Sequence, residues 1–294
     1  MIEEITILNE TIGDSIFVDM LVSPFVLIEV DLGSVNASHT TSKFVNQIGE
    51  FLENSTLGVR PISVIGYIVG DSEVEIKSRK NKLSRLINPL ENMAILVDEY
   101  RLNFVADSTV KYSVTYQENN DVMCKFMITG KAYNPLFEDR EQNRKTVAST
   151  LGRFHFPLTI PKKNGIIMGE RTNSLIATLV NDGQVDVGMK IVIEAKATVV
   201  NPIIIDVETQ EFIKLNKTMV EGERITINTN EGEESVRGQI GNGAEDNYFG
   251  YWDLDGSWLK LRVGDTLLRY DAEQDTIKNM EVIVYYSQRY LEVQ

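Results

Sequence analysis

The chain has 294 residues, with 29 basic and 43 acidic side chains and a net charge of −14. That length suits about two domains of roughly 150 residues, each large enough to bury a core of its own. Both halves are acidic, with 14 basic against 21 acidic residues in 1–150 and 15 against 22 in 151–294, which argues against a protein that holds nucleic acid by neutralising phosphates.

Sequence features also bear on the compartment. Cys124 is the only cysteine, so no intrachain disulfide is expected, and the composition fits folding in a reducing cytoplasm. The first residues, MIEEITILNE, lack the basic and apolar regions of a secretory signal. The sequence has no run of about 18 apolar residues, so we expect no membrane insertion.

One helix is predicted, over residues 72–87. Ser72 and Glu75 have the capping-box spacing, in which the hydroxyl and the carboxylate each bond the other residue's free amide. The apolar residues that follow recur at helical spacing and form one stripe: Ile76, Leu83 and Ile87. Pro89 has no amide hydrogen and disfavours helix at Asn88, so the helix should stop there.

Antiparallel strands are predicted for most of the remaining chain, because apolar and polar residues alternate and turn signals separate the runs. The clearest alternating runs are 110–117, 122–128, 190–200 and 259–263. Asn-Pro pairs follow two of them, at 134–135 and 201–202. They should end those strands, since proline cannot donate to a sheet ladder. The expected fold class is mainly β with one helix.

The polar segment EDREQNRK, at 138–145, has little to bury and fits either an interdomain connection or a short exposed helix. We place the domain boundary there. The prediction is an N-terminal β domain over 1–140, a linker over 141–152 and a C-terminal β domain over 153–294. Backbone in the linker should open easily and be the first site of proteolysis.

No catalytic, cofactor-binding or metal-binding residues are predicted. The two histidines, His39 and His155, match no zinc-binding spacing. DLDG at 253–256 resembles half of a calcium loop but lacks the later glutamate, so a tight turn is the better interpretation. Nucleophile and phosphate-loop motifs are missing as well. A glycosidase with two converging carboxylates is the enzyme alternative, because sequence does not reveal convergence.

Two groups of side chains are candidates for contacts. The predicted helix carries five basic residues: Lys77, Arg79, Lys80, Lys82 and Arg85. They fit an acidic partner or, more simply, a solvated face with its positive charge toward the helix C-terminus. Five aromatic residues lie within 248–258: Tyr248, Phe249, Tyr251, Trp252 and Trp258. Such residues stack on sugars or dock a protein partner when exposed, and alternating core residues explain the cluster about as well.

The order and spacing of several short motifs resemble the distal tail proteins of long-tailed bacteriophages that infect Gram-positive bacteria. In the first half these motifs are LSRLINPL at 83–90 and GKAYNPLF at 130–137. In the second half they are FPL at 156–158, NDG at 181–183, NPIII at 201–205 and GDTLL at 264–268. The chain departs from the family at Gln210, where a glycine usually supplies a positive φ, and this leaves the type of that turn open.

This resemblance implies that the N-terminal domain forms a hexameric ring and that the C-terminal domain is a galectin-like β-sandwich. Such proteins are structural hubs at the virion tail tip. They connect the tail tube protein to the tail-associated tip protein and carry receptor-binding proteins, while genomic DNA passes without specific binding. They are not enzymes, use no cofactor and are made in the cytoplasm of the host bacterium.

A carbohydrate-binding module for host cell-wall attachment is the alternative, motivated by the sandwich pattern and the aromatic cluster. We expect instead that the C-terminal domain docks proteins and has no intrinsic affinity for monosaccharides. Galectin-type recognition, as the resemblance implies it, needs a histidine on the concave face, and His155 lies at the domain entrance. If Asp255-Gly256 turns the chain, Trp252 and Trp258 would form an exposed apolar patch, which more often marks a protein contact.

Overall fold

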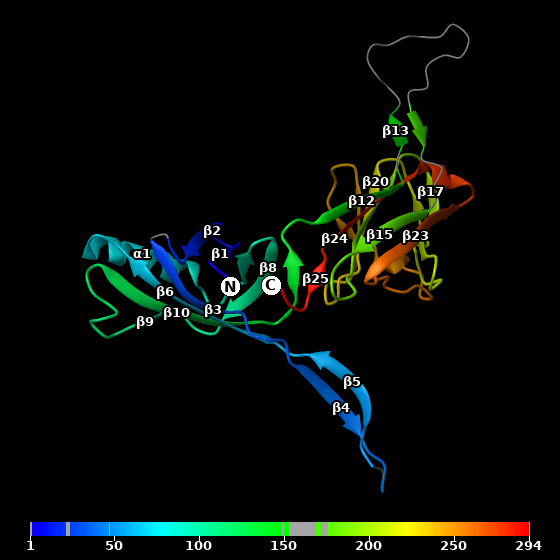
Figure 1. Ribbon diagram of the computed structural model, residues 1–294. Helices are drawn as coiled ribbons and strands as arrows, with labels where there is room; N and C mark the ends of the chain where they lie inside the picture. Colours follow the sequence, from blue (N-terminus) through cyan, green and yellow to red (C-terminus); the bar gives the residue numbers. More distant parts are fainter. Residues whose placement is uncertain are drawn as a thin grey trace. The chain divides into compact units, whose positions relative to one another are not determined.

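The computed structural model describes residues 2–21, 24–46, 48–148, 150–152, 169–171 and 176–293. It forms two compact units: unit 1 contains Met1–Glu141 and Tyr290–Gln294, and unit 2 contains Gln142–Arg289. Strands predominate in both units, and the described residues include one α-helix (Figure 1). The predicted mainly β class with a single helix is therefore confirmed.

Unit 1 is built on one long sheet that closes on itself. Its strands are β1 (Glu4–Asn9), β2 (Asp14–Asp19), β3 (Phe25–Asp31), β6 (Arg60–Val69), β7 (Met93–Val97), β8 (Tyr100–Ala106), β9 (Lys111–Tyr112), β10 (Met123–Ala132), β11 (Phe137–Asp139) and β25 (Arg289–Tyr290). Their order is β25-β11-β8-β7-β1-β2-β3-β6-β10-β9, and β8 also pairs with β10. That extra pairing closes the strands from β8 to β10 into a barrel. Buried residues alternate along β6 and β10, as a filled barrel interior requires.

Helix α1 (Glu73–Leu86) begins and ends where predicted. The Ser72 hydroxyl accepts a hydrogen bond from the Glu75 amide at 3.4 Å, as in a capping box. The Glu75 carboxylate accepts from the Asp71 amide at 3.0 Å, one residue earlier than a capping box predicts. Asn88-Pro89 lies just beyond the last turn and prevents the helix from continuing.

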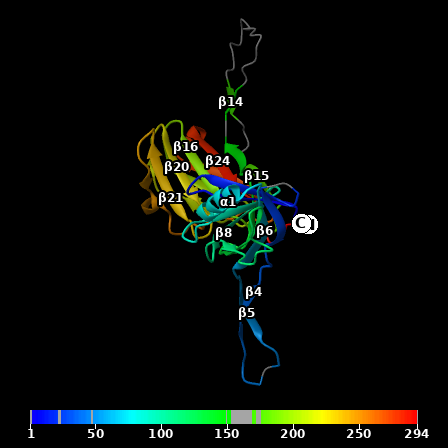
Figure 2. The ribbon, with the colours of Figure 1, turned by 90° about the vertical axis from the view of Figure 1, so that its left-hand side faces the viewer.

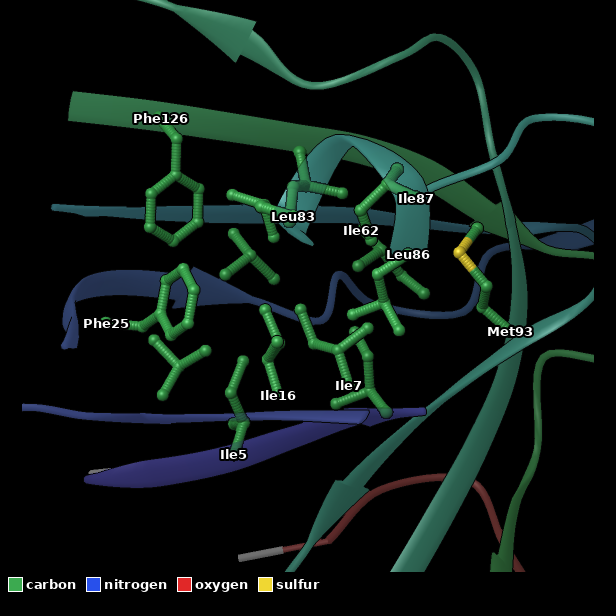
Figure 3. Close-up of a cluster of buried hydrophobic side chains, with 14 of the residues drawn as sticks. Ile5, Ile7, Ile16, Phe25, Ile62, Leu83, Leu86, Ile87, Met93 and Phe126 are labelled. Atoms are coloured by element: carbon green, nitrogen blue, oxygen red, sulfur yellow. The ribbon is translucent and has the colours of Figure 1, made fainter. Parts of the chain in front are cut away.

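The core of unit 1 lies between the barrel strands and the helix (Figure 3). It joins side chains from several strands and from the end of α1: Ile5, Ile7, Ile16, Phe25, Ile62, Met93, Phe126, Leu83, Leu86 and Ile87. The rings of Phe25 and Phe126 meet edge to face, with centroids 6.4 Å apart. Burial of each aliphatic side chain contributes about 1.5–3 kcal/mol to stability. The packing of the apolar stripe of α1 against the strands, more than helix propensity, therefore stabilises the helix.

Strands β4 (Ala37–Ser42) and β5 (Phe51–Leu57) form a separate two-stranded sheet in unit 1. Figure 1 shows this hairpin running away from the barrel strands. Every residue of β5 is exposed, as is every residue of β4 except the last. The pairing therefore encloses no core of its own, and an isolated two-stranded hairpin of this kind is marginally stable in water.

Unit 2 is a β-sandwich. Its first sheet contains β12 (Asn143–Ala148), β24 (Met280–Tyr286), β16 (Lys190–Ala195), β20 (Glu223–Asn228), β21 (Ser235–Ile240) and β22 (Asp246–Asn247) in that order. Its second sheet contains β15 (Ile176–Asn181), β23 (Gly264–Glu273), β17 (Val199–Asp206) and β18 (Phe212–Lys214), with β19 (Thr218–Met219) paired to β17. Two short strands, β13 (Thr150–Gly152) and β14 (Gly169–Arg171), pair with each other, and short 3₁₀ helices cover Phe249–Tyr251 and Thr276–Asn279.

One apolar cluster fills the sandwich from both sheets. The first sheet contributes Ile191, Ile227 and Val282, and the second contributes Leu179, Ile204 and Leu268. Figure 2 shows β16, β20 and β21 of the first sheet. Side chains from two facing sheets that share one core define sandwich packing, so the expected C-terminal β-sandwich is confirmed.

Asn134-Pro135 behaves as predicted, since β10 ends at Ala132, shortly before it. The prediction for Asn201-Pro202 is wrong. The run 190–200 is two strands, β16 and β17, in different sheets. Asn201-Pro202 lies inside β17 at a register shift between Val200 and Ile203, and Asn201 has a φ of 47°. A bulge accommodates proline because the extra residue is unpaired. The pair therefore bends the strand and does not end it.

Two other alternating runs contain less strand than predicted. Over 110–117 only β9 is a strand, and Val114 and Tyr116 are 97% and 79% exposed. Over 259–263 no strand is assigned, although Leu259 and Leu261 are buried. Leu261 forms an isolated β-bridge with Val187, so the alternating pattern predicted the burial of Leu259 and Leu261 but not a continuous strand.

Unit 2 begins and ends earlier in the chain than the predicted C-terminal domain: it covers Gln142–Arg289, where 153–294 was predicted. The predicted linker 141–152 contains β12, which pairs with β24 and adds an edge strand to unit 2. Val147 of that strand belongs to the unit 2 core. Residues 290–294 belong to unit 1, where β25 pairs with β11. The chain thus returns to unit 1 after it completes unit 2.

Candidate interaction surfaces

The predicted chemical features can be placed individually. His39 lies on exposed β4, where its Nδ1 is 2.8 Å from the Ser55 hydroxyl, and His155 falls outside the described residues. DLDG at 253–256 is a turn, in which the Gly256 amide donates to the Asp253 carbonyl at 3.0 Å. Among the described residues, no group of three or more His, Cys, Asp or Glu side chains is arranged to hold a metal ion. No helix in the described ranges is long and apolar enough to cross a membrane.

The tip of the β4–β5 hairpin carries exposed apolar side chains, here called the hairpin cluster. Its members, with their exposed fractions, are Phe44 (72%), Val45 (93%), Ile48 (101%), Phe51 (54%) and Leu52 (62%). The rings of Phe44 and Phe51 meet edge to face with centroids 5.9 Å apart, so the two arms touch through them. Contiguous exposed apolar patches mark interaction sites. The sequence signal is two apolar pairs, at 44–45 and 51–52, on either side of a turn.

The predicted aromatic cluster forms a stacked surface on unit 2, here called the aromatic platform: Phe249, Tyr251, Trp252, Leu254 and Trp258. Trp252 and Trp258 stack with ring centroids 4.2 Å apart, and Phe249 stacks at 6.3 Å and 6.2 Å from them. Both tryptophans pack partly buried against the unit 2 core. Phe249, Tyr251 and Leu254 are 49%, 40% and 93% exposed. The two tryptophans therefore fit the interpretation as core residues, and Phe249 and Tyr251 fit the interpretation as an exposed contact surface.

A buried ion pair lies beside the aromatic platform. Lys217 Nζ is 4.7 Å and 4.6 Å from the ring centroids of Tyr248 and Tyr251. It also lies 3.3 Å from the Glu223 carboxylate, whose side chain is 1% exposed. Burial, followed by the neighbouring Glu223 carboxylate, raises the pKa of Tyr248 to about 12. A Cβ on Gly238 would lie 1.9 Å from the Tyr248 ring, which explains why a glycine occupies the middle of β21.

Four of the five basic side chains on α1 contact acceptors of unit 1. The contacts are Lys77 to Glu73 (2.7 Å), Arg79 to Glu75 (3.4 Å), Lys82 to Asp14 (3.9 Å) and Lys80 to the Asn119 side-chain oxygen (2.7 Å). The bonded Glu73 carboxylate raises the pKa of Lys77. These local partners favour the interpretation of the helix bases as a solvated face.

Arg60 is a fully buried cation that the sequence analysis missed. Its donors reach the carbonyl oxygens of Pro135 (2.8 Å), Leu32 (3.2 Å), Gly33 (2.7 Å) and Leu291. Its guanidinium also lies 4.6 Å from the centroid of the Phe137 ring. Arg60 thus joins the C-terminal segment to the barrel. The only sequence signal is one arginine beside Pro61 at the start of an alternating apolar strand.

A surface hollow of about 230 Å³ on unit 2 is lined by charged residues. Lys196 lies 2.9 Å from both Glu194 and Glu281, and Arg224 lies 2.5 Å from Glu194. Hydrogen bonds from Lys196 and Arg224 hold the pKa of Glu194 below its usual value. The principal charges of this hollow are therefore engaged with one another.

Two family models match the sequence, one in each unit. A phage tail protein RIFT-related domain matches residues 21–129, and a siphovirus-type tail component, C-terminal domain, matches residues 182–290. With the barrel and the sandwich, these matches define a two-domain β protein of phage tails. The chain belongs to the siphovirus-type tail component family, as the resemblance predicted. No curated protein matches its sequence.

Solved structures share the fold over nearly the whole chain. The crystal structure of the SPP1 Dit (gp 19.1) protein is described as a paradigm of the hub adsorption apparatus in phages infecting Gram-positive bacteria. It has a TM-score of 0.65 at 12% identity and covers 97% of this chain and 98% of that chain. The phage P2 baseplate, activated with Ca, gives a TM-score of 0.57 at 12% identity over 100% of both chains. The form activated with Sr gives 0.54 at 11% identity, over 96% of this chain and 97% of that one. The family makes this chain a component of a phage tail, and these structures share its fold.

Proposed function

We propose that six copies of this chain form a ring at the virion tail tip, with unit 1 as the ring-forming part. The ring is the hub that connects the tail tube protein to the tail-associated tip protein and carries receptor-binding proteins. The chain performs no catalysis in this role. The hairpin cluster carries the proposal, and the family match and the fold shared with SPP1 Dit support it.

The hairpin cluster fits a contact between copies of this chain. Full burial of an apolar side chain contributes about 1.5–3 kcal/mol, so covering five of them adds several kcal/mol to each contact. A hairpin that docks on a different face of the next copy makes a heterologous contact, and such contacts close into rings when the rotation between copies allows it. A hairpin of marginal stability alone gains its order from the neighbouring copy.

The charge of the chain suits a ring through which genomic DNA passes without specific binding. Unit 1 lies in the half with 14 basic and 21 acidic residues, and most helix bases contact acceptors of their own unit. Free lysines and arginines along a channel would bind phosphates and slow transit. We therefore place the helix bases away from the channel and expect its wall to be acidic or neutral.

The ring is tested in the full chain with the substitutions Phe44→Ser and Phe51→Ser combined. Leu90→Ser is the matched control, since Leu90 is 93% exposed in unit 1 but lies outside the hairpin. Loss of two phenylalanine contacts weakens each subunit contact by about 3–6 kcal/mol, or roughly 10²–10⁴-fold. Native mass spectrometry and electron microscopy should show sixfold rings for the wild type and the control, and monomers for the double variant.

The outcomes separate the two parts of the proposal. If the double variant still forms rings, the hub stands and the hairpin is not its subunit contact. If the wild-type chain is monomeric in solution and is also missing from purified tails, the hub itself is rejected. A ring with Lys77, Arg79 or Lys80 lining its channel would contradict the acidic or neutral wall.

A further inference from the structure

We propose that the aromatic platform of unit 2 docks a basic protein segment that carries an apolar or aromatic anchor residue. This inference rests on the proposed function and deepens it, because it names a surface of the hub and the chemistry of the protein attached there. Its basis is the exposure, rigidity and surrounding charge of the platform.

The exposed part of the platform is apolar and held in place by backbone hydrogen bonds. The bonds join it to the β18 region: the Asp253 amide to the Lys214 carbonyl (3.0 Å), the Ser257 amide to the Phe212 carbonyl (2.8 Å) and the Asn216 amide to the Tyr251 carbonyl (2.7 Å). Lys217, whose Nζ lies 4.7 Å and 4.6 Å from the ring centroids of Tyr248 and Tyr251, supports the same segment. A preformed aromatic surface loses little conformational entropy on binding, which is why such residues dominate protein–protein contacts.

The charge around the platform is negative. Glu245, Asp246 and Asp255 are exposed, and no salt bridge joins any of them to another described residue. The adjoining lysines are engaged: Lys214 with Glu273, Lys217 with Glu223 and Lys260 with Glu231. Arg237, opposite Asn247 across β21 and β22, is an exposed basic residue beside this segment. Three carboxylates against one arginine favour a partner with positive charge around its apolar anchor.

Stacking within the platform favours a protein over a saccharide. A sugar ring packs against an open aromatic face, but Trp252 and Trp258 cover each other at 4.2 Å and Phe249 stacks against both. The most exposed member is the aliphatic Leu254. An exposed apolar patch of this composition with a polar rim is typical of a protein contact.

The partner is identified by cross-linking in purified tails that contain the full chain. The photoreactive residue p-benzoylphenylalanine is placed at position 254, or at position 263 as the matched control, because Val263 is 53% exposed in unit 2 outside the platform. Mass spectrometry should recover, from position 254 alone, a segment of another tail protein with Lys or Arg beside an apolar residue. A synthetic peptide of that segment should bind the full chain, with affinity reduced about 10–100-fold by Leu254→Ser and unchanged by Val263→Ser.

The results that would contradict the proposed docking of a basic protein segment can be told apart from a failure of the ring. A cross-link to an acidic segment or to another copy of this chain overturns the proposal, as does no cross-link from position 254 in tails that contain the chain. Binding of the full chain to a bacterial cell-wall glycan, abolished by Phe249→Ser, would replace the protein partner by a saccharide. None of these results affects ring formation by unit 1. If the chain is missing from tails altogether, the proposed function and this inference fail together.

Discussion

Replacing Arg60 should destabilise unit 1 and leave unit 2 unchanged. Arg60→Met keeps most of the side-chain volume but removes the donors that reach four carbonyl oxygens, including those of Pro135 and Leu291. A hydrogen bond from a charged group contributes about 1.5–3 kcal/mol, but four bonds from one side chain are not additive. Each buried carbonyl left without its donor costs about 1–3 kcal/mol, so losing all four donors at this one site should cost about 3–5 kcal/mol in total. We expect a loss of that size in unit 1, or roughly 6–20 °C in Tm.

The two units can be followed separately because both tryptophans lie in unit 2. In a urea titration of the full chain, tryptophan fluorescence reports the unfolding of unit 2, and far-ultraviolet circular dichroism reports both units. The dichroism change that has no counterpart in fluorescence reports the unfolding of unit 1. Arg60→Met should lower the midpoint of that change and leave the fluorescence midpoint, which reports unit 2, where it is. The separate apolar cores of the two units lead to this expectation.

Arg140→Met is the matched control for this measurement. Arg140 donates a single exposed hydrogen bond, to the Asp98 carbonyl at 2.9 Å, and its replacement should cost less than about 1 kcal/mol. The reasoning is refuted if Arg60→Met costs as little as the control. It is also refuted if the fluorescence midpoint falls as far as the dichroism midpoint, since Arg60 would then stabilise both units.

Three further outcomes can be measured in the same way. Truncation after Arg289 removes the Leu291 carbonyl and Tyr290 of β25, so it should destabilise unit 1. Arg60→Met should then cost less in the truncated chain than in the full chain; equal costs in a double-mutant cycle would show that the two are independent. Gln210 has a φ of 62°, a left-handed conformation that costs a non-glycine residue about 1–2 kcal/mol. Glycine avoids this cost but loses about 0.5–1 kcal/mol more in conformational entropy on folding. Gln210→Gly should therefore raise the stability of unit 2 by up to about 1 kcal/mol; a lower fluorescence midpoint would contradict this. The pKa of Tyr248 is raised to about 12 in the folded chain from about 10 in the unfolded one. Its contribution is therefore fully present below pH ~10 and is lost as pH rises through ~12; Tyr248→Phe should remove this loss, and identical pH profiles for wild type and variant would reject it.

The helix could be predicted because all of its signals are local. Ser72, Glu75 and Pro89 act on backbone groups within a few residues of themselves, so their effect does not depend on the rest of the fold. The strand breaks were harder, because a proline ends a strand or bulges it according to what lies on the neighbouring strand. Asn201-Pro202 is accommodated by β23 across a register shift, and nothing within the local sequence specifies that partner.

The turn at Gln210 shows how a local rule is overridden. The family glycine is missing, yet Gln210 still adopts a positive φ. Asp206 holds the turn instead: its carboxylate accepts from the amides of Glu208 and Thr209 at 2.9 Å and 3.2 Å, and its carbonyl accepts from the Gln210 amide at 2.9 Å. Several hydrogen bonds together outweigh the steric cost of one residue, so the substitution strains the turn without changing its course.

The candidate surfaces were predictable only in part. The aromatic cluster is close in sequence, so composition alone located it, although its stacking depends on contacts with β18 and the core. Arg60 could not be assigned, because its carbonyl acceptors lie between 27 and 231 positions away in the chain. The hairpin cluster was missed for the opposite reason: its apolar residues have the composition of a core, and only the structure shows that unit 1 does not cover them.

Unit 1 is discontinuous in sequence, and this affects how ring formation can be tested. A fragment over 1–140 lacks β25 and the Leu291 carbonyl that Arg60 contacts. Its buried guanidinium would lose an acceptor, so a fragment that fails to assemble could simply be misfolded. Cleavage within 141–152 has the same ambiguity, since β12 is part of the unit 2 sheet and opens only with that pairing. Substitutions on the exposed hairpin of the full chain leave both cores intact, so a loss of rings there reports the subunit contact itself.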